Sequence, residues 1–140
     1  MKKEKKTEGN LAFKRSRCPI ANALDIFGDK WSLLIIRDLV IGKRRSLEFL
    51  SSPEKIAPNI LLDRLKKLEA MGLITRQPYQ QNPVRYECFL TKKGESLQPV
   101  MEAIIAWSKK NIPGTQESSR YLAAIRSQTR RKQNMNRHAK

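Results

Sequence analysis

The sequence predicts a mainly α-helical domain that carries one small β-hairpin, and three observations support this fold class. Apolar residues recur at helical spacing between residues 19 and 70, where Pro and Gly separate four segments. Beyond Gly72 the pattern changes to two short strand-like runs on either side of a polar loop. One more helical segment follows at residues 95–109. This order is that of a winged helix-turn-helix, with the helix-turn-helix itself between about Arg44 and Met71.

The first two helices are expected at residues 19–27 and at about residues 30–40. Pro19 suits the first turn of a helix, and Gly28 ends that segment. Its apolar stripe consists of Ile20, Ala23, Leu24 and Phe27. The second helix ends at Gly42 and is expected to bury Trp31, Leu34, Ile35 and Leu39.

The third and fourth helices form the expected helix-turn-helix. The third is short, at about residues 47–50, and contributes Leu47, Phe49 and Leu50 to the core. A turn at Pro53 follows, and the fourth helix begins at Pro58 and ends at Gly72. Its buried stripe is Leu61, Leu65 and Leu68, because these positions cluster on one side at 100° per residue. The opposite side then presents Asn59, Asp63, Lys66 and Ala70, with Leu62 at its edge.

After Gly72, residues 73–76 and 85–90 are expected to pair as strands, and residues 77–83 form a wing loop of about seven residues. The helix at residues 95–109 carries more apolar positions than one packing face requires: Leu97, Val100, Met101, Ile104, Ile105 and Trp107. Such a surplus indicates burial on two sides, and a dimer interface is the natural second side.

The charge of the chain lies mainly in its flanks. The formal net charge is +16, of which residues 1–17 hold +5 and residues 115–140 hold +6, so residues 18–114 hold 16 − 11 = +5. We therefore expect a basic N-terminal arm (1–17), a winged helix-turn-helix domain (18–114) and a basic, partly disordered C-terminal extension (115–140). This balance predicts a polyanionic partner, either nucleic acid or an acidic membrane surface.

Composition argues against several other classes of protein. The longest aliphatic run is residues 33–36, far short of the roughly 20 apolar residues that a membrane span needs. No apolar signal core follows the first ten residues, so a cytoplasmic location is expected. Cys18 and Cys88 have no Cys or His neighbour at ligand spacing, so no metal and no cofactor is expected. No constellation of catalytic residues is visible, so we expect no enzyme activity.

Several short motifs, taken together, resemble the HxlR-type winged helix-turn-helix regulators between about Cys18 and Lys110. They are Cys18-Pro19, Gly28-Asp29-Lys30-Trp31, the run Leu65…Leu68-Glu69…Gly72-Leu73, Leu90-Thr91…Gly94, and Pro99 with Trp107. The resemblance implies a homodimeric, DNA-binding transcription regulator whose fourth helix enters the major groove. It also implies a dimer through the first and last helices, here through Ile20, Leu24, Met101, Ile104, Ile105 and Trp107. Ser46 and the extension beyond Thr115 depart from the family pattern.

The fourth helix supplies candidate readers of double-stranded DNA. The Asn59 amide can pair with adenine N6 and N7, or it can cap the helix start beside Pro58. Leu62 can contact a thymine methyl, or it can be an edge-of-core residue. Asp63 accepts from cytosine N4 or, as we expect, pairs with Lys66 or Lys67 to orient them.

Cationic side chains are candidates for contacts to the DNA backbone. Lys66, Arg44 and Arg45 suit phosphate contacts, the alternative being a solvated face. At the wing, Arg85 can reach a narrow minor groove, or it can form an ion pair with Glu87.

Cys18 is the candidate redox residue. It follows Lys14, Arg15 and Arg17 and precedes a helix start, and both features favour the thiolate, which is the reactive form. The alternative is a small residue in the dimer interface without chemistry. The resemblance favours the reactive interpretation, because some HxlR-type regulators respond to oxidants or electrophiles through the Cys before Pro. Cys88 is expected to be an ordinary strand residue.

The leading functional prediction is a sequence-specific regulator that binds a near-palindromic operator as a homodimer, gated by oxidation at Cys18. Neither the inducer nor the operator sequence follows from the residues. A second class is an architectural or RNA-associated protein held to nucleic acid by its charged flanks. The ratio of specific to non-specific affinity at fixed salt separates the two, because any basic protein gains some affinity from counterion release.

Overall fold

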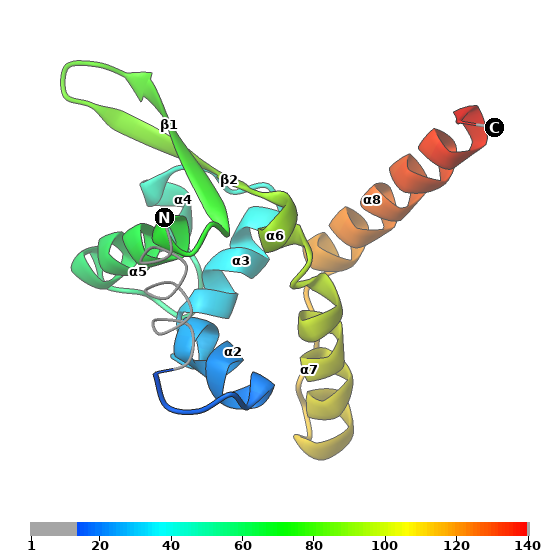
Figure 1. Ribbon diagram of the computed structural model, residues 1–140. Helices are drawn as coiled ribbons and strands as arrows, with labels where there is room; N and C mark the ends of the chain where they lie inside the picture. Colours follow the sequence, from blue (N-terminus) through cyan, green and yellow to red (C-terminus); the bar gives the residue numbers. More distant parts are fainter. Residues whose placement is uncertain (1–13, 140) are drawn as a thin grey trace, which may run out of the picture.

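The computed structural model describes residues 14–139, and its elements follow the predicted order. A helical body carries the β-hairpin on one side and two further helices, α7 and α8, on the other (Figure 1). The first three described helices are α2 (Pro19–Phe27), α3 (Ser32–Val40) and α4 (Ser46–Leu50). Most of the expected N-terminal arm lies outside the described residues. The winged helix-turn-helix class predicted from the sequence is confirmed.

Helix α5 (Pro58–Ala70) forms with Pro at its first position, as predicted. Gly72 follows it with a φ of 74°, a left-handed conformation that favours glycine, and its backbone N–H donates to the carbonyl of Glu69 at 3.0 Å. Leu61, Leu65 and Leu68 are each at most 4% exposed. The buried stripe predicted for this helix is therefore confirmed.

The wing consists of β1 (Ile74–Gln80) paired antiparallel with β2 (Arg85–Leu90). The register pairs Ile74 with Leu90 and Pro78 with Tyr86, and a shift follows between Pro78 and Gln80. The predicted loop at residues 77–83 is therefore too long, because β1 continues through Gln80 and only residues 81–84 connect the strands. Residues 77–80 lie in a polar stretch and show no alternation of apolar and polar residues, so the sequence does not mark them as a strand. They are extended because they pair with β2.

The helix expected at residues 95–109 corresponds to α7 (Gln98–Asn111), which has Pro99 in its first turn, and a separate short helix, α6 (Lys92–Glu95), precedes it. Met101 is 6% exposed and belongs to the core of its own protomer, which corrects its assignment to the dimer interface. It occupies the α7 face that packs inward, whereas Ile104 and Trp107 are 46% and 61% exposed.

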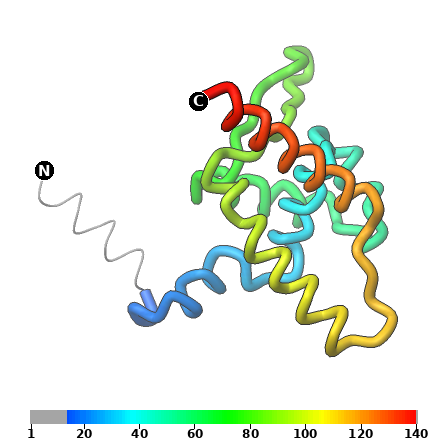
Figure 2. The backbone as a smooth tube through the Cα atoms, turned by 90° about the vertical axis from the view of Figure 1, so that its right-hand side faces the viewer, coloured from blue at the N-terminus to red at the C-terminus, as the bar shows by residue number. Residues whose placement is uncertain are grey.

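Residues 119–138 form a single helix, α8 (Ser119–His138), where partial disorder was expected. The chain turns back after α7 and passes α3 (Figure 2), and α8 then projects away from the body (Figure 1). Tyr121 near the start of α8 is 2% exposed, and Ile125 packs against the core. The extension therefore contributes to the core through its first turns, because one well-placed aromatic residue can anchor a polar helix.

The core lies between α3, α4, α5 and the base of the hairpin. Its largest fully buried side chains include Ile36, Leu39, Phe49, Leu68 and Ile74. Trp31 and Leu34 are only half-buried, and Leu47, predicted to face the core, is 73% exposed. On the short helix α4 only Phe49 points fully inward. No helix within residues 14–139 is long and apolar enough to cross a membrane.

Candidate nucleic-acid interface

The outward face of α5 is a continuous exposed stripe. Pro58, Asn59, Asp63 and Lys66 are exposed, as is Leu62 at 48%. Its residues recur every three to four positions and lie opposite the buried leucines. All of them can therefore contact the same partner surface at once, whether that surface is flat or grooved. Helix α5 lies at the left edge of the body in Figure 1. The structure therefore brings these predicted α5 residues together on one surface.

Asp29 fixes α5 to the start of α3, and sequence reasoning gave it no such role. Its Oδ2 accepts hydrogen bonds from the backbone N–H groups of Trp31 and Ser32, both at 3.0 Å, and its Oδ1 accepts from the Ser32 hydroxyl at 2.6 Å. The same carboxylate accepts a charged hydrogen bond from Arg64 Nε at 2.9 Å. An Asp directly before an apolar helix is a recognisable capping signal, but its partner 35 residues away is not.

These hydrogen bonds determine the ionisation of Asp29. Burial alone would raise the pKa of its carboxyl group, but the bonds from Ser32, Arg64 and the two backbone N–H groups outweigh burial and lower the pKa to about 2. The carboxylate is therefore ionised at every pH at which the protein is expected to work. The resulting ion pair holds the α5 face at a fixed angle to α3.

The wing is held by contacts on both of its faces. On one face the Arg45 guanidinium lies 3.8 Å from the centre of the Tyr79 ring and 3.4 Å from Glu87 Oε2. On the other face Arg76 pairs with Glu69 of α5 at 3.1 Å. Arg45 was predicted to contact phosphate, but its partners show that it also positions the hairpin. Arginine over an aromatic ring is a favourable stack with directional preference.

Arg44 is tied into the body of the protein. Its Nη1 donates to the carbonyls of Leu39 and Lys43 at 2.9 and 2.8 Å, and its guanidinium lies 5.2 Å from the centre of the Phe89 ring. Its own carbonyl accepts from the Cys88 N–H at 2.8 Å. These contacts hold Arg44 at the junction between α3 and the wing through Nη1 and the ring stack, while a phosphate contact through its remaining N–H groups stays a prediction.

Two predicted ion pairs form with other partners. Asp63 pairs with the neighbouring Arg64 rather than with Lys66 or Lys67. Glu87 pairs with Arg45 rather than with Arg85, which is exposed and makes no ion pair within residues 14–139. In both cases an arginine held by a second contact lies closer to the carboxylate than the residue chosen by sequence spacing. Arg85 and Lys66 therefore keep their charges available at the surface.

The two cysteines occupy opposite environments. Cys18 is exposed at the N-terminal end of α2, where its carbonyl accepts from the Asn22 side chain at 2.8 Å. Cys88 is 3% exposed, and burial raises the pKa of its thiol to about 11. Cys88 therefore remains a protonated strand residue. Within the described part of the chain, no three His, Cys, Asp or Glu side chains gather in a way that would hold a metal ion.

The predicted dimer surface is exposed on α2 and α7, away from the wing (Figure 1). Ile20 and Leu24 are 71% and 52% exposed, close to the values for Ile104 and Trp107 on α7. Ile105 is half-buried and packs against the core of its own protomer. Large apolar side chains left exposed on two helices are of the kind that marks a protein contact.

Comparisons with known proteins agree with this fold. The family model described as HxlR-like helix-turn-helix matches residues 26–116. The HTH-type transcriptional regulator YdeP of Bacillus subtilis is 38% identical over 93 residues, which cover 66% of this chain and 73% of YdeP. An HTH-type transcriptional regulator of Synechocystis is 38% identical over 87 residues, which cover 62% of this chain and 64% of that relative, slightly less than two thirds of its length.

Solved structures show the same similarity. The reduced form of the redox regulator HypR superposes with a TM-score of 0.63 at 31% identity, over 69% of this chain and 95% of HypR. The reduced form of the transcriptional regulator YodB from B. subtilis gives 0.59 at 32% identity, over 71% of this chain and 98% of YodB. These relatives are regulators rather than enzymes. The chain therefore belongs to the HxlR-like helix-turn-helix family of transcriptional regulators.

Proposed function

We propose that this protein binds a near-palindromic operator as a homodimer, with α5 of each subunit in the major groove and each wing over the adjacent minor groove. The observation that carries the proposal is the exposed stripe of α5, which the Asp29–Arg64 ion pair holds at a fixed angle. The formal net charge of +16 supports a polyanionic partner. The family supports DNA over other polyanions.

Each residue of the stripe has a stated role in this proposal. Asn59 reads adenine through its amide, and Leu62 contacts a thymine methyl. Lys66 contacts phosphate, as does Arg85 at the rim of the minor groove. Asp63 is balanced by Arg64, so its carboxylate repels the DNA backbone less than an unpaired one would. Pro58 starts the helix without an unpaired backbone N–H and fixes the direction in which its first turn, with Asn59, approaches the base edges.

The homodimer sets the spacing of the operator. Two recognition helices must lie about one turn of DNA apart, roughly 34–36 Å, to read two half-sites from one side. We assign the contact between subunits to Ile20, Leu24, Ile104 and Trp107, with Ile105 supporting it from within α7. Selection of bound sequences from random double-stranded DNA tests the whole proposal. Recovery of an inverted repeat with half-sites one turn apart supports it, whereas recovery of unrelated sequences contradicts it.

Asn59→Ala is expected to weaken binding to the selected operator by about 1–3 kcal/mol and binding to random DNA very little, as for a lost bidentate base contact. Fluorescence anisotropy at a fixed salt concentration measures both affinities. Lys66→Ala on the same face is the matched control, because loss of a phosphate contact weakens both DNAs and lowers the salt slope by about one. Equal losses on both DNAs for Asn59→Ala would reduce Asn59 to a positioning role.

We further propose that oxidation of Cys18 releases the operator. Cys18 is exposed and opens α2, which carries half of the proposed dimer surface. Among the relatives, HypR is described as a redox regulator with reduced and oxidised forms, and YodB has a structure after treatment with diamide. In this chain, diamide would take two electrons and two protons from two Cys18 thiols and leave a disulfide between subunits, which would change the distance between the two α5 helices.

Operator binding by the unmodified protein is accordingly expected to fall under diamide and to return with dithiothreitol. Cys18→Ser is expected to bind the operator and to ignore diamide, because no other exposed thiol lies within residues 14–139. Cys88→Ala is the control and is expected to keep the full response, since Cys88 is buried. An unchanged diamide response in Cys18→Ser would show that Cys18 only packs and that any inducer acts elsewhere.

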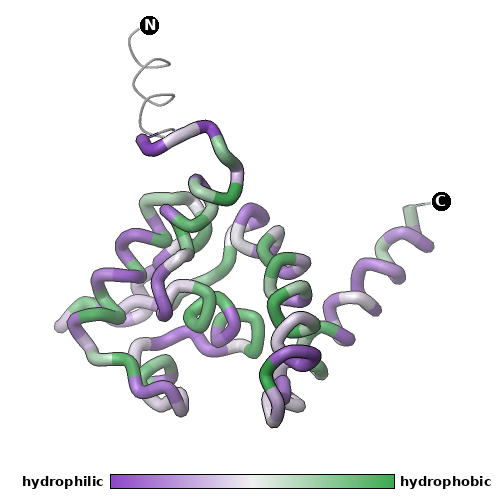
Figure 3. Tube along the Cα trace, turned by 90° about the horizontal axis from the view of Figure 1, so that it is seen from below, coloured by the Kyte–Doolittle hydropathy of each residue, from purple (hydrophilic) through white to green (hydrophobic). Residues whose placement is uncertain are grey.

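A second candidate function, non-specific binding to nucleic acid, is favoured by the projecting part of α8. Its colouring in Figure 3 is largely hydrophilic. Residues 129–140 hold five Lys or Arg and no Asp or Glu, so they carry +5. Deletion of residues 129–140 is expected to lower affinity for random DNA about 10-fold at moderate salt while the operator preference survives.

This deletion differs from removal of the whole extension. Deletion of residues 119–140 also removes Tyr121 from the core and is expected to cost about 3 kcal/mol of stability, as for other buried aromatic residues. Denaturant unfolding of both truncated proteins checks the difference. Equal stabilities would show that α8 makes no contribution to the fold.

A further inference from the structure

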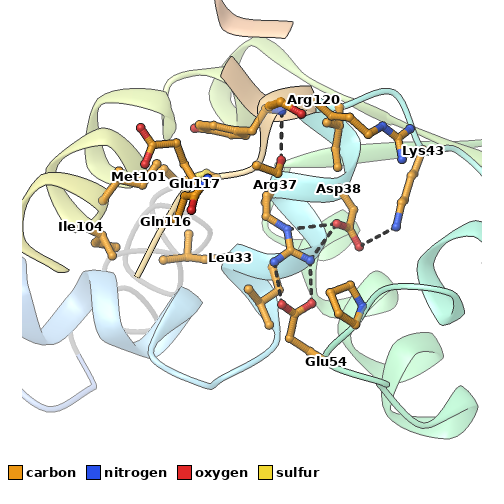
Figure 4. Close-up of a pocket in the computed structure, with 17 residues that line it drawn as sticks. Leu33, Arg37, Asp38, Lys43, Glu54, Met101, Ile104, Gln116, Glu117 and Arg120 are labelled. Carbon is orange, nitrogen blue, oxygen red and sulfur yellow. Dashed lines mark hydrogen bonds and ion pairs between the residues drawn. The ribbon is translucent and has the colours of Figure 1, made fainter. Parts of the chain in front are cut away.

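A cavity of about 770 Å³ lies between α3, α7 and the segment that leads into α8 (Figure 4). Its apolar wall includes Leu33, Leu34, Met101, Ile104 and Ile105. The turn before α5 adds Pro53 and Glu54 on the opposite side. A cavity of this size and lining is typical of sites that enclose a small organic molecule.

The charged residues of the cavity balance one another. Three cations line it, Arg37, Lys43 and Arg120, and three carboxylates, Asp38, Glu54 and Glu117. The Arg37 guanidinium donates to both Glu54 oxygens at 2.8 and 2.9 Å and also to Asp38, as the dashed lines in Figure 4 show. Because the lining carries no net formal charge and its strongest ions are already paired, it favours an uncharged ligand.

Two buried polar atoms in the wall have no hydrogen-bond partner among the described residues. They are Glu117 Oε2 and the Tyr121 hydroxyl. Tyr121 is 2% exposed, so bulk water does not serve its hydroxyl. The other Glu117 oxygen accepts from Lys109 Nζ at 3.1 Å. Buried polar groups are nearly always hydrogen-bonded, so two unpartnered groups four residues apart in one cavity wall indicate a missing polar partner.

The protonation of these two groups defines what that partner must offer. Burial, and then the charge of Glu102, raises the pKa of Tyr121, so its hydroxyl remains a donor at neutral pH. The pKa of Glu117 is lowered by the hydrogen bond to its own backbone and then by Lys109, so its carboxylate remains an acceptor. A single group that both accepts and donates satisfies the pair.

We propose that this cavity binds an uncharged, mainly apolar small molecule whose hydroxyl or carboxamide group accepts from the Tyr121 hydroxyl and donates to the Glu117 carboxylate. Both residues follow residue 116, where the family match ends, so the polar end of the site belongs to the C-terminal extension of this chain. The proposal concerns ligand binding alone and stands whether or not the protein binds an operator.

The test uses 2-naphthylmethanol as the probe and the full-length protein labelled at its Ile and Met methyl groups. The methyl resonances of Met101, Ile104 and Ile105 are expected to shift on titration, while Met135 at the far end of α8 stays unchanged. 2-Methylnaphthalene, which lacks the hydroxyl group, and the anion 2-naphthoate are each expected to bind about 10-fold more weakly. Equal affinity of the three compounds, or shifts that spare these methyl groups, overturns the proposal.

Tyr121→Phe provides a second, independent measurement, because it removes only the unpartnered hydroxyl. We expect the variant to bind 2-naphthylmethanol about 10-fold more weakly and 2-methylnaphthalene as well as before, without loss of thermal stability. Tyr86→Phe on the wing is the matched control and is expected to change neither affinity. If a second copy of the chain fills the cavity, the probe will shift none of the three methyl groups in the dimer, and the proposal fails.

Discussion

Replacing Trp107 by Glu is expected to dissociate the proposed homodimer and to lower operator affinity by at least about 1,000-fold. The Trp107 side chain is 61% exposed in the single chain, so the substitution leaves the core untouched. In the dimer it would place a carboxylate in an apolar contact, where no partner compensates its loss of hydration. A monomer then binds one half-site with only about half of the binding free energy. Sedimentation velocity and anisotropy measure the two effects.

Met135→Glu is the matched control for this experiment. Met135 is 72% exposed, but it lies on the projecting part of α8, far from α2 and α7. The same new charge at that position is expected to leave the dimer intact and the operator affinity within a few fold. A Trp107→Glu protein that still sediments as a dimer at micromolar concentration would place the subunit contact on another surface.

Asp29→Ala is expected to lower the free energy of unfolding by about 2–4 kcal/mol. The substitution removes the acceptor for two backbone N–H groups at the start of α3 and for the Ser32 hydroxyl. It also leaves the Arg64 guanidinium without its partner on α3. Because Arg64 lies on α5, operator binding is expected to weaken as well. Asp25→Ala is the control: Asp25 pairs with Arg15 at the surface, and its loss is expected to cost less than about 1 kcal/mol.

The hydrogen bonds that Asp29 accepts from Ser32, Arg64 and two backbone N–H groups outweigh its burial and make stability depend on pH in a defined direction. The folded pKa of Asp29 is lowered from 3.8 to about 2, so its contribution of about 2 kcal/mol is fully present above pH 5. The contribution is lost as the pH falls from about 4 to 2, because the unfolded chain then binds the proton more readily. Denaturant unfolding between pH 2 and 6 is expected to show this loss in the unmodified protein. In Asp29→Asn the free energy of unfolding is expected to depend less steeply on pH over this range. An unchanged pH dependence would show that Asp29 is not its source.

Helix α5 shows what the sequence predicts well. Its limits follow from Pro58 and Gly72, which act through local backbone geometry, and its buried face follows from three leucines at helical spacing. Those signals are contained within about fifteen residues of chain. The family motifs between Cys18 and Lys110 then place the other helices around it in the correct order.

Features that depend on distant partners are less well predicted. Arg44 is predicted to contact the DNA backbone because it is a cation beside another cation, but the sequence does not show that its Nη1 serves Leu39 and Lys43 and that its guanidinium stacks on Phe89. Nothing in the local pattern reveals the Phe89 contact, which depends on the pairing of β2 with the body. The depth of burial of Tyr121 depends on distant partners in the same way. The sequence around Tyr121 is rich in arginine and indicates a solvated stretch. Only the folded structure shows that α3 packs beside this part of α8.

The two halves of α8 differ in cooperativity. Residues 121–125 share the core, so they are expected to open only when the whole domain unfolds. Residues 129–138 are all exposed, and their helical form depends on intrinsic propensity alone, against repulsion among neighbouring arginines. We therefore expect this outer half to unfold and refold independently of the domain. A polyanion bound along this half would neutralise the repulsion and favour the helix. The helical content of residues 129–138 would therefore rise with ionic strength and with the fraction of protein that has a polyanion bound.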